Sequence, residues 1–422
     1  MKLFSRARGL VELNVYYWLI ALYFFAFGLQ FILFPSIVTF VLQEGPARVG
    51  LAQTALSAPM FALLLIGGLV AERTRPARTL ALLQASMAVA SLGLAAIIFS
   101  GRLTYFTLLF YAVLVGSLAA LLGPARDSAL NGVVARVSSN GRGPSIAAAA
   151  AMTTSVQIGA QIGGIVVGRA AGAHPAPFLL LQAAVLLAAA GVALLLRAPR
   201  PARRGGTLKS ALTDLREGLS YAFRNPVMGP MLISAAYSGV FIIGSLQVLF
   251  PLLIRENFGG SAHGQSNQLS TIFACFWAAS FVSAVVLARA PPLLRPGRAM
   301  LASHMIGAVL LISFVFSMPF WVMALLALCF GLVAGVWISM SRTIAQSAAA
   351  PQYLGRVLAI YSMGFMGGAP IGSAVAGVAA MAVGPRWACL VPGLGLLAGA
   401  GALTLATSLW RLEADEHRRL RA

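Results

Sequence analysis

The sequence predicts an all-α membrane protein with twelve transmembrane helices in two pseudo-symmetric six-helix bundles. The chain of 422 residues is 59% hydrophobic and only 9% charged, whereas a soluble domain has about 25% charged residues. Apolar runs of roughly 20 residues, the length that spans a bilayer, recur along the chain. The stretch 159–168 nearly repeats at 368–377, with six of ten positions identical. Length, apolarity and internal repetition together favour a duplicated membrane protein.

Polar breaks between the apolar runs divide the chain. The longest break, 198–226, predicts an N-terminal bundle at 1–197, a cytoplasmic linker at 198–226 and a C-terminal bundle with a short tail at 227–422. Leucines at helical spacing in the linker, from Leu208 to Leu219, predict a short amphipathic helix on the inner membrane surface. The expected spans are 14–42, 47–71, 78–99, 103–123, 144–168, 176–197, 227–254, 267–288, 298–317, 320–341, 356–382 and 386–410.

Basic residues predict the orientation of the spans. If the N-terminus is cytoplasmic, the inner segments hold 25 of the 30 Lys and Arg residues. Cytoplasmic loops carry an excess of these residues in membrane proteins. We therefore expect a multi-pass protein of a bacterial inner membrane with both termini in the cytoplasm. The same topology explains the net charge of +20, so we expect no nucleic-acid partner.

The internal repeat extends beyond its first stretch. At a constant offset Gly28 aligns with Gly244, and Arg126 aligns with Arg342. Parallel six-span repeats predict a cavity between the two halves, with a substrate site near the middle of the membrane. Small residues four apart allow membrane helices to approach closely. This spacing predicts helix packing at Gly159, Gly163, Gly164, Gly168, Gly368 and Gly372.

Several motifs carry a family resemblance. Residues 67–78, with Glu72-Arg73 followed by Arg75 and Arg78, resemble the inner-loop signature of the major facilitator superfamily, although Glu72 replaces the usual Asp. Residues 159–164 resemble the span-five signature of its exporter branches, with Ala160 in place of Pro. Three further segments, 124–126, 215–219 and 355–357, resemble the siderophore-exporter subgroup. The resemblance covers nearly the whole chain and implies the major facilitator fold.

The resemblance implies roles for two groups of residues. Four charged residues at inner span ends form a candidate conformational latch, in which Glu72 pairs with Arg126; simple topology signalling is the alternative. Polar and aromatic side chains within the spans are candidates for the substrate cavity, and interhelical packing is the alternative for each. The latch candidates are Glu72, Arg73, Arg78 and Arg126. The cavity candidates are Gln30, Gln157, Gln161, Tyr237, Gln247, Trp277, Trp337 and Tyr361.

The absence of certain residue types from the expected spans limits the functions that the sequence favours. No Asp or Glu falls in the middle of an expected span, and His304 is expected near the inner start of span nine. Because buried carboxylates are the usual proton relays, protons are only a candidate coupling ion. Catalytic, cofactor and metal-ligand patterns are absent, so we expect no enzyme and no cofactor. The function expected is an alternating-access exporter, acting as a monomer on a siderophore or drug-like amphiphile. A metabolite importer, a facilitator or a non-transporting receptor is the alternative.

Overall fold

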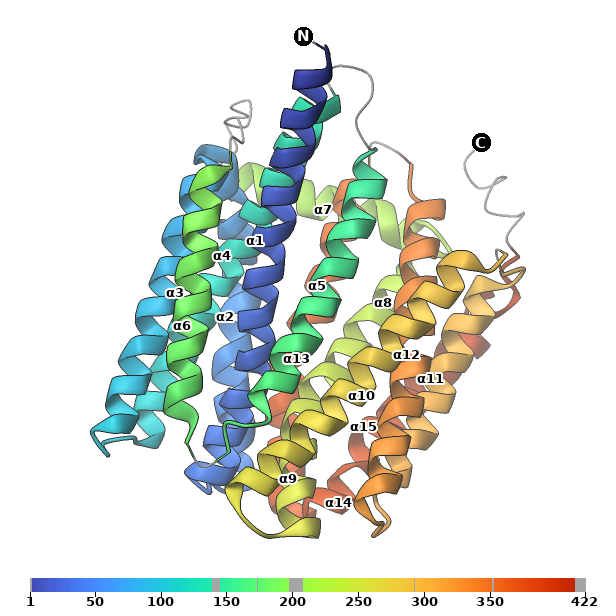
Figure 1. Ribbon diagram of the computed structural model, residues 1–422. Coiled ribbons are helices and arrows are strands. Elements are labelled where there is room, and N and C mark those ends of the chain that lie inside the picture. Colours follow the sequence, from blue (N-terminus) through green and yellow to red (C-terminus); the bar gives the residue numbers. More distant parts are fainter. Residues whose placement is uncertain are drawn as a thin grey trace. The chain divides into compact units, whose positions relative to one another are not determined.

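The fold is described from a computed structural model, in which every regular element of the described residues is a helix (Figure 1). The described residues are 2–138, 145–172, 174–196, 208–291, 293–350 and 353–413.

The helices before the linker correspond to the first six expected spans. Prolines at the first positions of α3 and α6 suit helix starts, where a missing amide hydrogen costs nothing. The Ser145 hydroxyl caps α5 by accepting a hydrogen bond from the Ala148 amide at 3.1 Å. These elements are α1 (Lys2–Ser36), its π-helical continuation η1 (Ile37–Val41), α2 (Pro46–Arg73), α3 (Pro76–Phe99), α4 (Tyr105–Ser138), α5 (Ile146–Gly168) and α6 (Pro175–Leu195).

The later helices begin with the linker helix α7. Span seven is built from three consecutive elements, because a π-helical segment separates two α-helices. The elements are α7 (Leu208–Arg224), α8 (Met228–Ser238), the π-helix η2 (Gly239–Gly244), α9 (Ser245–Phe258), α10 (Ala262–Arg289), α11 (Pro296–Ser313), α12 (Phe320–Ala348), α13 (Leu354–Val383), α14 (Pro385–Ala388), α15 (Leu390–Ala406) and the 3-10 helix η3 (Ser408–Arg411).

The predicted all-α membrane class is confirmed. Eleven segments within the described residues are long and apolar enough to cross a membrane, and α2 coincides with the remaining expected span, 47–71. Two boundaries differ clearly, and the first is the start of span one, where α1 begins at Lys2 rather than at 14. Span four was expected to end at 123, but α4 continues to Ser138. Pro124 is accommodated inside the helix, and an ion pair between Arg136 of α4 and Glu12 of α1, 3.4 Å apart, accompanies the extension.

Packing divides the described residues into two compact units. Unit 1 contains Met1–Leu42, Pro59–Ala211 and Ser261–Ser270, and unit 2 contains Gln43–Ala58, Leu212–Gly260 and Thr271–Ala422. Each unit thus includes one short segment from the other half of the sequence.

In unit 1, α1 runs beside α5 and α3 beside α6 (Figure 1). At the α1–α5 crossing, a Cβ added to Gly28 would overlap with the Gln161 carbonyl, and one added to Gly164 would overlap with the Phe25 carbonyl. The first turns of α10 also belong to this unit. The Ser270 hydroxyl donates a hydrogen bond to the Ile165 carbonyl of α5 at 2.6 Å. Helix α5 is therefore held by close backbone approach to α1 and by a side-chain hydrogen bond from α10.

In unit 2, α11 packs between α12 and α15, and α13 packs on α8 and η2. The first turns of α2 join this unit through α13. Gly50 and Gly377 lie backbone to backbone, and the Thr54 hydroxyl donates to the Pro370 carbonyl at 3.1 Å. Glycine therefore allows close backbone approach between α2 and α13 in unit 2, as it does between α1 and α5 in unit 1.

Candidate functional site

A buried polar cluster lies inside unit 1. The Gln30 side-chain carbonyl on α1 accepts hydrogen bonds from the Tyr111 hydroxyl of α4 at 2.7 Å and from the Gln182 amide of α6 at 2.8 Å. The Ser91 hydroxyl of α3 lies 3.5 Å from that of Tyr111. All four side chains are buried. In an apolar surrounding each such bond is costly to lose, so the cluster ties four helices together.

A second cluster lies inside unit 2 and is centred on His304 of α11, which is only 1% exposed. Its Nδ1 lies 2.8 Å from the Tyr237 hydroxyl, and its Nε2 lies 2.8 Å from the Ser238 hydroxyl. Both partners are on the last turn of α8. The expectation that His304 sits near the inner end of its helix is wrong, because α11 spans Pro296–Ser313 and places His304 at its middle.

Aromatic rings extend this cluster. The Trp337 ring of α12 lies 5.3 Å from the His304 ring and 5.2 Å from the Phe365 ring, centroid to centroid. Its indole N–H donates to the Ser234 hydroxyl at 3.1 Å. The Tyr361 hydroxyl of α13 lies 3.0 Å from the Ser341 hydroxyl of α12. Unit 2 therefore contains a stacked aromatic core with a polar edge.

The structure places the eight cavity candidates in different surroundings. Tyr237, Trp337 and Tyr361 are brought together in the His304 cluster, and Gln30 lies in the unit 1 cluster. Gln161 is buried on α5, and its side-chain amide nitrogen has no hydrogen-bond partner within the described part of the chain. The remaining three, Gln157, Gln247 and Trp277, are partly exposed. Their contact with substrate stays a prediction.

The six packing glycines also differ. Gly164 and Gly168 of α5 lie against α1, and Gly163 makes only ordinary contact with the Phe25 ring. Gly159 faces open space. In α13, Gly368 and Gly372 lie against the backbone of α8 and η2, so a Cβ at either would overlap with main-chain atoms. The aligned pair Gly28 and Gly244 makes matching approaches, because Gly28 meets the Gln161 carbonyl of α5 and Gly244 meets the Ala369 carbonyl of α13.

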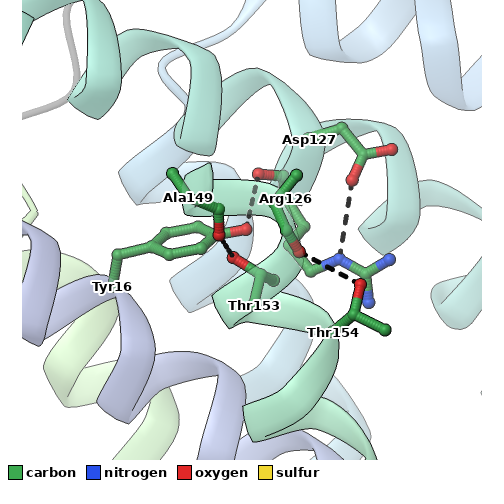
Figure 2. Close-up of polar contacts among 7 residues, drawn as sticks. Tyr16, Arg126, Asp127, Ala149, Thr153 and Thr154 are labelled. Carbon is green, nitrogen blue, oxygen red and sulfur yellow. Dashed lines mark hydrogen bonds and ion pairs between the residues drawn. The ribbon is translucent and has the colours of Figure 1, made fainter. Parts of the chain in front are cut away.

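Among the latch candidates, Arg126 is the best defined (Figure 2). Its guanidinium nitrogen Nε lies 3.7 Å from the Asp127 carboxylate, and its Cζ lies 5.0 Å from the centre of the Phe24 ring. The Tyr16 hydroxyl donates to the Arg126 carbonyl at 3.4 Å. Arg73 and Arg78 are exposed near the junction of α2 and α3. The helix α2 includes Glu72, but its side chain lies outside the described residues, so the Glu72–Arg126 pair stays a prediction.

The linker helix α7 is attached to unit 2. The Arg356 guanidinium of α13 bonds both Asp214 and Glu217, the latter at 3.2 Å. The Tyr221 ring stacks on Tyr353 with centroids 4.1 Å apart. A pocket of about 460 Å³ opens beside this stack, lined by Glu217, Ser220, Tyr221, Arg224, Asn225, Pro226 and Tyr353.

Sequence reasoning missed several members of the two clusters. Gln182, Ser91, Ser234, Ser238 and His304 were not among the candidates. His304 carried a usable signal, because it stands in an apolar run without a neighbouring charge. The serines carried no such signal, because a serine hydroxyl in a helix can donate a hydrogen bond to a carbonyl of the preceding turn. The Ser238 hydroxyl does so to the Ser234 carbonyl at 2.6 Å.

Comparison with known proteins identifies the family. Residues 18–373 match the profile of the Major Facilitator Superfamily. The chain belongs to this superfamily. Its members are membrane transporters of small molecules, not enzymes, and the predicted fold of two pseudo-symmetric six-helix bundles is confirmed.

Among curated relatives, the chain is similar to enterobactin exporters. It is 26% identical over 364 residues to the enterobactin exporter EntS of Escherichia coli O1:K1, covering 83% of this chain and 81% of the relative. The Shigella flexneri exporter is 24% identical over 359 residues, with coverage of 83% and 80%. The predicted resemblance to the siderophore-exporter subgroup is thereby confirmed.

Solved structures support the same fold. The nucleoside transporter NupG superimposes with a TM-score of 0.71 at 14% identity, covering 95% of this chain and all of NupG. A bacterial homologue of the lysosomal transporter Spinster, in an inward-facing and occupied conformation, gives a TM-score of 0.67 at 14% identity, with coverage of 99% and 98%. At this sequence identity the superpositions show a similar fold and nothing about the substrate.

Proposed function

We propose that this protein is a secondary transporter that exports a small amphiphilic organic molecule, of the siderophore or drug-like class, across a bacterial inner membrane. The observation that carries the proposal is its relationship to enterobactin exporters over 83% of the chain. Export runs from the cytoplasm outward, with both termini of the chain in the cytoplasm. The protein acts as a monomer and has no nucleic-acid partner.

The interiors of the two units suit such a substrate. Unit 2 offers aromatic faces at Trp337, Tyr361 and Phe365, beside hydroxyl groups. Unit 1 and its α5 helix offer amide groups at Gln30, Gln157 and Gln161. Amphiphilic ligands are held by apolar and aromatic surfaces with a few placed donors and acceptors. We assign the substrate contacts to these residues, which come from both halves of the sequence repeat.

The charged residues at the inner ends of α2 and α4 would control access. Arg126, held by Phe24 and Asp127, is the fixed partner that Glu72 would engage. A pair of this kind shifts the balance between inward and outward forms by about tenfold for each ~1.4 kcal/mol. Arg73 and Arg78 would complete the latch through headgroup or carboxylate contacts.

Secretion by whole cells tests the direction and the substrate class. The chain is expressed in cells that synthesise enterobactin but lack an exporter for it, and external enterobactin is measured by mass spectrometry. We expect the secretion of enterobactin to rise well above that of empty-vector cells. A cationic amphiphilic dye is tested in the same way as a second substrate. Gly159→Ala is a control for substitution itself, because its added Cβ meets open space, and it should secrete as the unaltered protein does. Secretion equal to empty vector for both compounds, with the protein present in the membrane, would contradict export.

A further inference from the structure

His304 combines burial, depth and ionisable chemistry in a way that no other residue of the two clusters does. It is the ninth of the 18 residues of α11, so it lies about 12 Å along the helix from either end. Histidine changes charge between about pH 5 and pH 8. An ionisable side chain at this depth in a membrane protein is costly and is retained for function.

The hydrogen bonds around His304 have a defined direction. The Ser238 hydroxyl proton is donated to the Ser234 carbonyl at 2.6 Å. The Ser238 oxygen can then only accept from His304, which makes Nε2 the protonated nitrogen of the neutral ring. Nδ1 is left as the acceptor, and the Tyr237 hydroxyl donates to it at 2.8 Å. Nδ1 is therefore the atom that can take up a further proton.

Few charges face this ring. Helix α15 and the α8 segment carry no charged residue. Helix α11 itself carries Arg298, and the other charged residues are Arg342 on α12, Arg356 on α13 and Arg411 on η3. The other titratable groups on α8, α12 and α13 are Tyr237, Cys329 and Tyr361. Arg298 lies over the Trp410 ring, 5.2 Å from its centre. No carboxylate on these elements is available to neutralise an imidazolium.

The partners of His304 adjoin an irregular part of span seven. Tyr237 and Ser238 are the last residues of α8, and the π-helix η2 begins at Gly239. π-Helical turns cost hydrogen-bond geometry and often mark functional sites. The η2 backbone contacts Gly368 and Gly372 of α13 directly. The partners of His304 therefore adjoin the part of unit 2 where two helices touch through their main chains.

We propose that His304 is the proton-binding site of this transporter, with Nδ1 accepting the proton and the α8–η2 junction responding to it. The inference rests on the transport activity proposed above. Uptake of one proton from water converts the imidazole to an imidazolium, and Tyr237 turns from hydrogen-bond donor to acceptor. Because a buried imidazolium without a counter-ion is unfavourable, the proton binds in a conformation that opens this site to water. Proton binding and opening therefore favour each other.

The first test separates proton coupling from substrate movement. Purified full-length protein is reconstituted in proteoliposomes with labelled enterobactin, and two rates are measured: accumulation driven by a pH gradient, and exchange of internal for external substrate without a gradient. For His304→Gln we expect accumulation to fall by about tenfold or more, with exchange retained in large part. His174→Gln, an exposed histidine of unit 1, should match wild type in both. Equal accumulation by His304→Gln and wild type would overturn the proposal.

The second test needs no substrate, so it distinguishes a failed proton site from a failed transport assay. Trp337 is left as the sole tryptophan, and its fluorescence is followed from roughly pH 8 to pH 5. Protonated imidazole quenches a neighbouring indole, so we expect emission to fall with a single midpoint that His304→Gln lacks. Tyr237→Phe, which removes the partner of Nδ1, should shift that midpoint. A pH response that is identical with and without His304 contradicts the proposal. The tryptophans replaced by Phe are Trp18, Trp277, Trp321, Trp387 and Trp410.

Discussion

Gly372 of α13 lies directly against the carbonyl group of Val240 in η2, so close that no side chain larger than hydrogen fits between them. This contact joins the π-helical part of span seven to span eleven. By the repeat its counterpart is Gly163 of α5, which makes only ordinary contact with the Phe25 ring. The matching close approaches are those of the aligned pair Gly28 and Gly244, which meet the Gln161 carbonyl of α5 and the Ala369 carbonyl of α13.

Gly372→Ala should lower the thermal stability of the detergent-solubilised protein. The new Cβ forces the η2 and α13 backbones apart, and overpacking of this kind costs about 1–3 kcal/mol. Gly159→Ala is the matched control, because it adds the same methyl group where nothing lies within 4 Å. Melting temperatures of the two variants provide the comparison. Equal melting temperatures would show that the crossing tolerates a wider spacing.

Gln30→Leu should destabilise unit 1 by leaving the Tyr111 hydroxyl and the Gln182 amide without their shared acceptor. Buried unsatisfied groups cost about 1–3 kcal/mol. Tyr111→Phe should cost less, because Gln182 still bonds Gln30. Unfolding measurements on both single variants and the double variant give the coupling energy. Strictly additive effects would mean that the two side chains do not act as one network.

Arg356→Gln should release α7 from unit 2, because it breaks the bonds to both Asp214 and Glu217. These groups are partly exposed, so the expected loss is about 0.2–1 kcal/mol for each pair. Hydrogen–deuterium exchange of α7 should quicken. The control is Arg295→Gln, which breaks a similarly exposed pair with Glu413 and should leave α7 exchange unchanged. If the exchange of α7 is unaltered in Arg356→Gln, the Tyr221–Tyr353 stack, and not the ion pairs, holds α7 in place.

Glu72→Gln should slow or abolish substrate export while leaving the protein folded. The predicted latch loses its acidic partner for Arg126, and a weakening of ~1.4 kcal/mol shifts the conformational balance about tenfold. Export assays with membrane levels measured in parallel provide the check. Arg102→Gln, an exposed basic residue outside both helices, is the control for charge alone. Normal export by Glu72→Gln would rule out the latch.

Hydropathy and charge were enough to predict the spans. Apolar length specifies a membrane helix because the bilayer satisfies no backbone hydrogen bonds, and the spacing of leucines likewise predicted α7, which runs from Leu208 to Arg224. The predicted end of span four at 123 is wrong, because α4 continues through Pro124 to Ser138. Within a membrane protein, a helix continues past such residues when neighbours such as Tyr16 and Phe24 receive them.

The candidate sites were less predictable. Tyr237, Trp337 and Tyr361 are predicted as interior aromatics, yet His304, which contacts Tyr237 and Trp337, is expected too close to a helix end. The π-helices could not be predicted, because the local shift of backbone hydrogen bonds in 37–41 and 239–244 has no counterpart in hydrophobic spacing. The grouping of Gln30 with Tyr111 and Gln182 depends on the packing of α1, α4 and α6, which sequence order alone does not specify.

The most direct test of export is net flux of labelled enterobactin by the purified protein in proteoliposomes of known orientation. An imposed pH gradient supplies the driving force, and substrate is offered at the cytoplasmic face. We predict accumulation against the substrate gradient that collapses when a protonophore is added. Movement that only equilibrates the compound, or none above protein-free vesicles, would contradict the account.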